Sequence, residues 1–357
     1  MGILNRPNDL SIERTIPLSK DLVLRNNIMV IDKPLLGNTR FGLLLEKMDT
    51  LASDTARKYI YQFYPDVVVI TAAIDDTIIR NATDVAKDLL FKSRINYVGK
   101  TSMEIGIRIE QPGNPATHIA TCYFTMVARR GSREKRVSVQ IPPLNYIDDM
   151  EKRRYKKAIE RKELYLKEKN LMKQPPSLDE YKLLSELHKS QDDPNFNGIL
   201  SGKLIMRSWE RMFPAYKNPN QTIFGGYLAK RAYELSSICV ELIATHRPVI
   251  AAVNRINFIN PVKIGDKLLF TAHIVYTEKC FICVEATIGR MGRNEHKISA
   301  QSNSCLFTFI NMDENLNPHD VDKIYPTTYA EDDGFLEASR SLKDIMSELH
   351  GGLLEVV

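Results

Sequence analysis

Residues 37–49 read GNTRFGLLLEKMD, and residues 218–234 read NPNQTIFGGYLAKRAYE. Each stretch places glycine where an apolar helical pattern begins, and in the first stretch that pattern continues through Leu51 and Ala52. The spacing predicts one helix over about residues 42–62 and another over about 226–244. A helix start offers free backbone N–H groups and the positive end of the helix dipole, which favour a developing negative charge.

These two stretches belong to a weak internal repeat. Four segments recur in the same order: FGLLL at 41–45 and FGGYL at 224–228, DLLF at 88–91 and KLLF at 267–270, YVGK at 97–100 and YTEK at 276–279, and CYFT at 122–125 and CLFT at 305–308. One such match could arise by chance, whereas four in order indicate a duplicated module.

Each copy continues from its helix into segments rich in β-branched and aromatic residues. The predicted strands are 67–73, 88–98, 102–111 and 118–128 in the first copy, and 248–258, 267–276, 281–289 and 296–309 in the second. A long helix needs a sheet on which to bury its apolar face, so the sequence predicts an α+β fold in which an antiparallel sheet wraps each helix.

The composition limits what kind of protein this is. The chain has 357 residues, 43% of them hydrophobic, and a formal net charge of +5, which fits a soluble globular protein of two or more domains. Five scattered cysteines favour a reducing compartment over a disulfide scaffold. The sequence contains no run of about 18 apolar residues that would predict a membrane span. Its N-terminus has no secretory pattern, although a presequence could have been removed.

The predicted boundaries follow the repeat. We expect an N-terminal segment at 1–29, a first domain at 30–132, a charged helical linker at 133–202, a second domain at 203–315, and a C-terminal tail with a helix at 316–357. Within the linker, residues 151–170 read EKRRYKKAIERKELYLKEKN. This run could contact nucleic acid or phosphate, but its interleaved acids favour a solvated linker helix.

Asp49 is the candidate for chemistry in the first helix. It lies among Leu45, Met48 and Leu51, and a carboxylate at the edge of an apolar face is costly unless it is paired or used. Asp49 could act as a general base or attack a carbonyl directly. Periodicity alone equally allows an aspartate that faces solvent beside Glu46 and Lys47.

A resemblance makes the prediction more specific. The segments 218–234, 97–104 and 255–266 make the chain similar to the double-hotdog acyl-CoA thioesterases over about residues 30–330. The resemblance implies two tandem hotdog domains, each a long helix wrapped by an antiparallel sheet. It also implies hydrolysis of fatty acyl-CoA to the free acid and coenzyme A, with no cofactor besides the substrate.

The family's site combines an acid from one hotdog with asparagine and backbone amides from the other. The acid lies eight residues after the first glycine of a Gly-Gly pair, and the same count from Phe41 reaches Asp49. The resemblance therefore implies one competent site, made by Asp49 with Asn218 or Asn220 and the backbone of Gly225 and Gly226. The asparagine would hold water or substrate, and the Gly226 N–H would stabilise the oxyanion.

The opposite site departs from the family pattern. The second copy has Tyr233 where the acid is expected, so a site built from Tyr233 and Asn38 should be silent. Coenzyme A carries phosphates, which basic and hydroxyl side chains can bind. The candidates for this contact are Lys100, Ser102, Arg255 and Lys279.

Other functions rank lower on the sequence. Cys280 and Cys283 form a CxxC in a predicted strand, where side chains three residues apart point to opposite faces, so we expect no metal site. The missing second acid and Phe41 in place of a glycine favour an alternative, in which a catalytically weakened hotdog protein is a structural or assembly subunit. The resemblance also implies a homo-oligomer, a trimer of double hotdogs, in the mitochondrial matrix, or in the cytoplasm if no presequence is removed.

Overall fold

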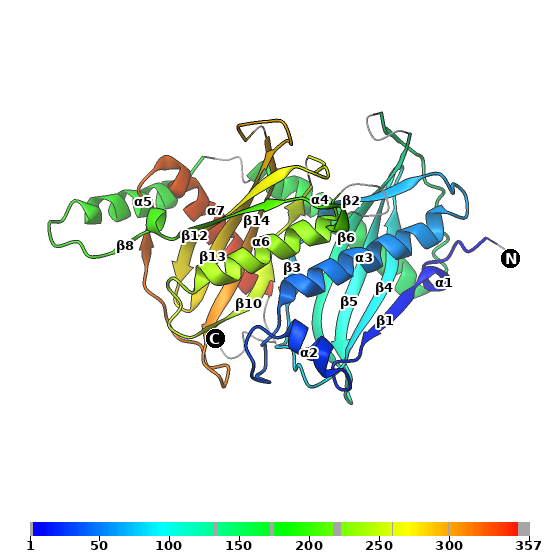
Figure 1. The fold of residues 1–357 in the computed structure, drawn as a ribbon, viewed down its shortest axis with the longest axis horizontal. Coiled ribbons are helices and arrows are strands. Elements are labelled where there is room, and N and C mark those ends of the chain that lie inside the picture. The colour runs from blue at the N-terminus through cyan, green and yellow to red at the C-terminus, as the bar shows by residue number, and fades with distance from the viewer. Residues whose placement is uncertain are drawn as a thin grey trace.

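The computed structural model describes residues 3–131, 135–171, 175–216, 223–258, 260–298 and 300–348. Two long helices, α3 (Phe41–Ile60) and α6 (Gly225–Val240), lie on one face of an extended antiparallel sheet (Figure 1). The apolar face of α3 is buried, and α3 ends shortly before Pro65, which cannot continue a helix. These helices confirm the α+β prediction, with bounds that differ from the predicted ones by up to four residues.

Within the described residues, the sheet has thirteen strands and is continuous across both copies. Its main order is β1-β4-β5-β6-β3-β10-β14-β13-β12-β9, with β2 and β7 paired to β6 and β11 paired to β2. The strands of the first half are β1 (Ile12–Ile16), β2 (Val68–Ile74), β3 (Thr77–Ile79), β4 (Leu89–Val98), β5 (Ser102–Gln111), β6 (Thr117–Arg130) and β7 (Val137–Ser138). Those of the second half are β9 (Ile205–Arg211), β10 (Arg247–Val253), β11 (Ile256–Asn257), β12 (Lys267–Glu278), β13 (Phe281–Met291) and β14 (Ala300–Met312).

Two short ladders join the halves. Strand β3 pairs with β10, where Thr77 lies opposite Val253, and β2 pairs with β11, where Ile74 lies opposite Ile256. The N-terminal segment also contributes to the first half, because β1 pairs with β4 along the sheet edge. The segment predicted to lie outside the first domain therefore supplies an edge strand, and it also forms α1 (Pro7–Leu10) and α2 (Leu22–Ile28).

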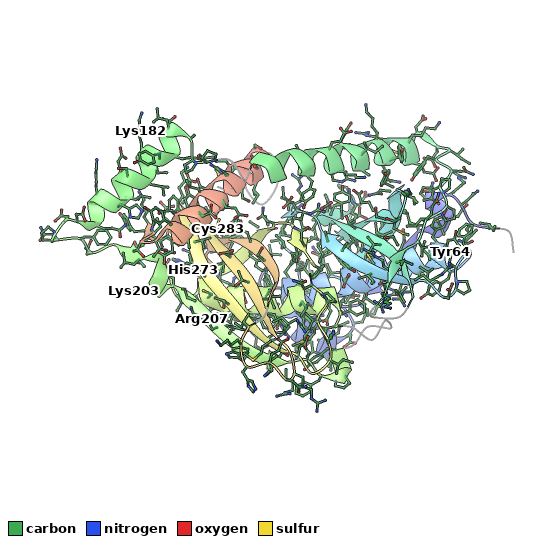
Figure 2. All side chains as sticks on the ribbon, turned by 90° about the horizontal axis from the view of Figure 1, so that it is seen from above. Tyr64, Lys182, Lys203, Arg207, His273 and Cys283 are labelled. Atoms are coloured by element: carbon green, nitrogen blue, oxygen red, sulfur yellow. The ribbon has the colours of Figure 1, made fainter. Side chains whose placement is uncertain are left out.

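The other face of the sheet is covered by helices from the linker and the tail. These are α4 (Asp149–Leu171), which contacts β4, and α7 (Tyr329–Glu348), which contacts β12, and they lie along one side of the molecule in Figure 2. Helix α5 (Leu178–Gln191) and the small parallel pair β8 (Ile199–Leu200) and β15 (Ile324–Tyr325) lie at the end of the second half. No helix in the described part of the chain is long and apolar enough to cross a membrane.

Helix α4 is fixed to the sheet through two arginine contacts. Arg161 forms an ion pair with Glu104 at 2.5 Å and stacks on the ring of Tyr123 at 3.6 Å. Arg255, from the second half, stacks on Tyr165 of α4 at 3.6 Å. Stacking and pairing of this kind suit the planar guanidinium group, so the linker helix is held by both halves.

Candidate active site

Asp49 lies in the third turn of α3, where this helix meets the first turn of α6. The backbone N–H of Gly226 donates a hydrogen bond to Asp49 Oδ2 at 2.7 Å. The hydroxyl of Thr71 on β2 donates to Asp49 Oδ1 at 2.5 Å. The Asp49 side chain is completely buried, so of the two readings left open by the sequence, the solvent-facing one is wrong. The carboxylate also satisfies one of the N–H groups that a helix start leaves without a partner.

Burial sets the proton affinity of this carboxylate. Loss of hydration raises the pKa of Asp49 from 3.8 to about 6. The hydrogen bonds from Thr71 and Gly226 lower that pKa, and the charge of Glu46 raises it. A carboxylate with a pKa near 6 is ionised at neutral pH and accepts a proton more readily than an exposed aspartate, which suits a general base.

Glycine makes the close approach of the two helices possible. A Cβ on Gly226 would lie 2.7 Å from Asp49 Cβ and 2.9 Å from Glu46 Cα. A Cβ on Gly42 would lie 3.0 Å from the Lys230 carbonyl oxygen, also across the helix pair. The helices therefore run in opposite directions with a glycine of each against the other, and Gly226 is required for its N–H to reach Asp49.

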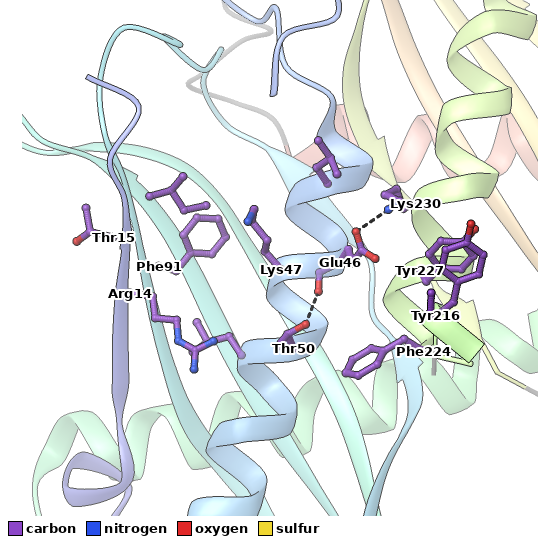
Figure 3. A pocket seen from close by; sticks show the side chains of 14 residues that line it. Arg14, Thr15, Glu46, Lys47, Thr50, Phe91, Tyr216, Phe224, Tyr227 and Lys230 are labelled. Atoms are coloured by element: carbon purple, nitrogen blue, oxygen red, sulfur yellow. Dashed lines mark hydrogen bonds and ion pairs between the residues drawn. The ribbon is translucent and has the colours of Figure 1, made fainter. Parts of the chain in front are cut away.

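A cavity of about 570 Å³ lies beside this contact, between β1, α3 and the start of α6 (Figure 3). Its lining residues are Arg14, Thr15, Ile16, Leu43, Glu46, Lys47, Thr50, Leu51, Phe91, Ala215, Tyr216, Phe224, Tyr227 and Lys230. Glu46 and Thr50 flank Asp49 on α3, while Phe224 and Tyr227 flank Gly226. The Asp49 carboxylate thus lies behind the cavity wall.

The charges around this cavity are mostly basic. Lys230 pairs with Glu46 at 2.7 Å, and Arg14 pairs with Asp54 at 2.6 Å, while Lys47 is exposed at the cavity. Tyr216 and Tyr227 stack with ring centroids 4.2 Å apart on the other wall. The cavity therefore combines aromatic surface with positive charge, which suits a ligand with both apolar and anionic parts.

The structure brings together some of the predicted site residues. Asp49 and Gly226 are in contact, and Gly225 is the first residue of α6, with its Cα facing the ring of Phe258. Asn218 and Asn220 lie outside the described residues. The buried side-chain amide of Asn38 forms hydrogen bonds with the backbone of its own loop at Val30, Ile31 and Lys33.

The predicted phosphate-binding residues do not line this cavity, as far as the described residues show. Lys100 is exposed in the turn before β5, and Ser102 begins that strand. Lys279 is exposed in the turn between β12 and β13 and has a positive φ of 52°. Arg255 is engaged by Asp75 and by Asn257, in addition to its stacking on Tyr165.

Sequence reasoning missed Thr71, although it placed this residue in a strand. The available signal was a hydroxyl in the middle of an otherwise apolar segment, VVVITAAI at 67–74, but nothing in that segment names Asp49 as its partner. The CxxC at Cys280 and Cys283 does not lie wholly in a strand, so that part of the prediction is wrong. Cys280 lies in the turn before β13 and not in a strand, and the described part of the chain holds no group of three or more potential metal ligands.

Comparison with known proteins shows which proteins this chain is similar to. Residues 220–295 match the family model described as the thioesterase superfamily. The chain resembles the acyl-CoA thioesterases along nearly its whole length. It is 25% identical to mitochondrial acyl-coenzyme A thioesterase 9 of Mus musculus over 94% of this chain and 78% of that protein. It is 27% identical to mitochondrial acyl-coenzyme A thioesterase 4 of Humulus lupulus over 76% of this chain and 55% of that protein.

A solved structure extends the likeness to the fold. The 12:0-ACP thioesterase from Umbellularia californica superposes with a TM-score of 0.51 over 84% of this chain and 94% of that one, at 7% identity. At this level of identity the match concerns the fold alone. Together with the family match, it confirms the predicted hotdog fold and the predicted resemblance.

Proposed function

We propose that this chain is an acyl-CoA thioesterase that hydrolyses fatty acyl-CoA to a free acid and coenzyme A. The observation that carries the proposal is the buried Asp49 carboxylate, which receives the N–H of Gly226 from the other half of the molecule. Relatives named acyl-coenzyme A thioesterases match 94% of the chain and supply the reaction class.

The proposed chemistry uses Asp49 as a general base. Its carboxylate takes a proton from water as the water oxygen attacks the thioester carbonyl carbon. The start of α6 supplies backbone N–H groups and the positive end of the helix dipole for the oxyanion. In this step the Gly226 N–H donates its hydrogen bond to the substrate oxyanion instead of to Asp49. The tetrahedral intermediate then expels a thiolate, which needs no proton to leave because a thiol has a pKa of about 8.5.

Direct attack by Asp49 is the other route. Its carboxylate oxygen would form an anhydride with the acyl group, releasing the thiolate before water hydrolyses the anhydride. In both routes Thr71 holds Oδ1, so that Oδ2 is the oxygen closer to the incoming group. Asn218 or Asn220 remains our candidate for holding the water or the substrate.

Substrate reaches Asp49 through the cavity of about 570 Å³ in this proposal. Asp49 has no exposed surface in this structure, so side chains of the cavity wall must shift to expose the carboxylate. Our candidate is Phe224, which lines the cavity directly before Gly225. Arg14 and Lys47 offer positive charge for coenzyme A phosphates at the same cavity. Lys47 is exposed, and the Arg14 side chain is 50% exposed against 19% for Arg255, so both are stronger candidates for this contact than Arg255.

The proposal is tested by measuring thiol release from an acyl-CoA series of increasing chain length. We expect Asp49→Asn and Asp49→Ala to lower kcat at least a hundredfold, the range that general acid–base catalysis supplies. Asp66→Asn is the matched control, since Asp66 is exposed and pairs only with Arg130 among the ion pairs found. Equal rates in the wild type and both Asp49 variants would remove Asp49 from the reaction.

One observation favours a second function. Because Asp49 is sealed behind the cavity wall, its carboxylate can also be explained as a cap for α6 in a catalytically weakened assembly subunit. Absence of turnover over the whole acyl-CoA series, together with stable co-purification in a larger complex, would favour this alternative.

Assembly and location are further proposals. We expect a homo-oligomer, a trimer of double hotdogs, which light scattering on the purified protein would measure. The names of the relatives include mitochondrial proteins, so we propose the mitochondrial matrix as the compartment.

A further inference from the structure

A second cavity lies at the other end of the α3–α6 contact. It measures about 380 Å³ and is bounded by the 30–39 loop, α6, and the adjoining ends of β10 and β14. Tyr233, which stands eight residues after Gly225 as Asp49 stands eight after Phe41, is part of its wall. The half of the molecule without a catalytic acid therefore keeps a cavity at the same position along the helix.

Two buried polar atoms at this cavity lack partners. Thr39 is 5% exposed, and its Oγ1 makes no hydrogen bond within the described structure. The same holds for Nε of Arg247, while NH2 of that guanidinium group donates to the Leu36 carbonyl oxygen at 2.7 Å. Both side chains belong to the lining, and buried donors without acceptors are destabilising. A ligand that supplies acceptor oxygens would satisfy them once the side chains that cover these two atoms shift.

The acidic side chains of this cavity have other roles. Glu314 pairs with Lys33 at 2.7 Å. Asp313 accepts hydrogen bonds from the side-chain amide and the backbone N–H of Asn317 and from the backbone N–H of Asn315, each at 2.8 Å. These bonds lower its pKa to about 2. Glu241, the third acid, is exposed. Among the described residues, none of these acids is recorded as a hydrogen-bond partner of Arg247. Burial lowers the pKa of Arg247, although the charges of Glu314 and Asp313 act on it and raise that pKa to a smaller extent.

The rest of the wall is mainly apolar. The apolar lining consists of Val30, Ile31, Leu35, Pro248, Ile250 and Met312. An anion such as inorganic phosphate would leave this surface without a partner, whereas a hydrocarbon chain would cover it. The ligand that fits has one anionic acceptor group and an apolar tail.

We propose that this second cavity binds a carboxylic acid with an apolar chain. Its carboxylate accepts hydrogen bonds from Arg247 Nε and Thr39 Oγ1, and its chain packs on the apolar wall. No bond is made or broken there, because Tyr233 replaces the acid. That the bound compound is the fatty acid released at Asp49 rests on the proposed function, whereas the binding itself does not.

Titration with sodium octanoate tests the proposal on the full chain. Isothermal calorimetry gives the affinity, and amide hydrogen exchange locates the site. We expect octanoate to protect residues 30–39 and 247–250, and to bind more tightly than octanol or octylammonium. Arg247→Met should weaken binding at this site at least tenfold, or about 1.4 kcal/mol, and Thr39→Val should weaken it several-fold.

The matched controls lie in the first cavity. Arg14→Met and Thr50→Val make the same chemical changes there, and should leave the protection at 30–39 intact. If Arg247→Met fails to fold, Thr39→Val and Arg247→Lys carry the test. No binding of octanoate, equal binding of octanol, or protection at 30–39 that survives Arg247→Met would overturn the proposal. The readout is binding, so an inactive protein would overturn the proposed function and leave this inference standing.

Discussion

Replacing Thr71 with valine removes the hydroxyl that donates to Asp49 Oδ1 at 2.5 Å, with little change in side-chain shape. This hydrogen bond lowers the pKa of Asp49, against the larger effect of burial. The variant should therefore raise that pKa above its wild-type value of about 6, so that a higher pH is needed to ionise the base.

The size of the shift follows from the bond that is lost. A hydrogen bond to a charged group contributes about 1.5–3 kcal/mol. One pKa unit corresponds to about 1.4 kcal/mol, so the shift should be about one to two units. The assay is the pH dependence of kcat/KM for acyl-CoA hydrolysis, whose rising limb reports the pKa of the base in the free enzyme. We expect that limb to be centred near pH 6 in the wild type and one to two units higher in Thr71→Val.

Thr71→Ser is the control, because it keeps the hydroxyl and should keep the midpoint near that of the wild type. A rising limb at the same pH in the wild type and in Thr71→Val would refute the reasoning. So would a limb that moves to lower pH, because the lost bond favours the charged form of Asp49.

Three further predictions concern stability and packing. Burial raises the pKa of Asp49 from 3.8 to about 6, so ionisation of Asp49 destabilises the fold as pH rises from about 4 to 6. The Asp49→Asn variant should therefore be more stable than the wild type by about 3 kcal/mol above pH 6. Chemical denaturation should show that this difference vanishes below pH 4. Gly226→Ala places a Cβ 2.7 Å from Asp49 Cβ and should lower the free energy of unfolding by about 1–3 kcal/mol and abolish most activity. Gly225→Ala meets only the movable ring of Phe258, so its free energy of unfolding should fall less. Equal losses in the two variants would contradict the packing argument. Arg161→Met leaves the Glu104 carboxylate buried without its ion pair and should lower the free energy of unfolding by about 2–3 kcal/mol. Adding Glu104→Gln to this variant should partly restore the loss. If Arg161→Met alone changes nothing, the ion pair does not contribute to stability.

The sequence predicts the parts of this fold that have a strong period. Helical spacing around Leu44 and Leu45 predicts α3, whose apolar face is buried. Alternation along 102–109 predicts β5, although most residues on both faces of this strand are buried in the structure. The connections between the halves have no such signal. Strands β3 and β11 contain three and two residues, which is too few to show a period. The pairing of β1 with β4 is equally invisible, since it joins segments about 75 residues apart.

The candidate site divides in the same way. The sequence predicts the positions of the glycines and of Asp49 because they lie at fixed spacings within their own helices. Thr71 comes from another element, and only the folded sheet brings its hydroxyl to Asp49. The charge of Arg255 predicts that it binds phosphate, but in the structure its guanidinium group contacts Asp75 and Tyr165 instead. Such a choice of partner depends on tertiary contacts that no local pattern records.

The ladders between β3 and β10 and between β2 and β11 join the two copies in one hydrogen-bonded sheet. Either copy expressed alone would present bare strand edges to solvent, which invites association with other chains. Melting should therefore proceed as one cooperative event for the whole sheet, which calorimetry on the full chain would measure. The second copy, which has Tyr233 at the position of Asp49, is therefore needed to complete the sheet that supports the first copy.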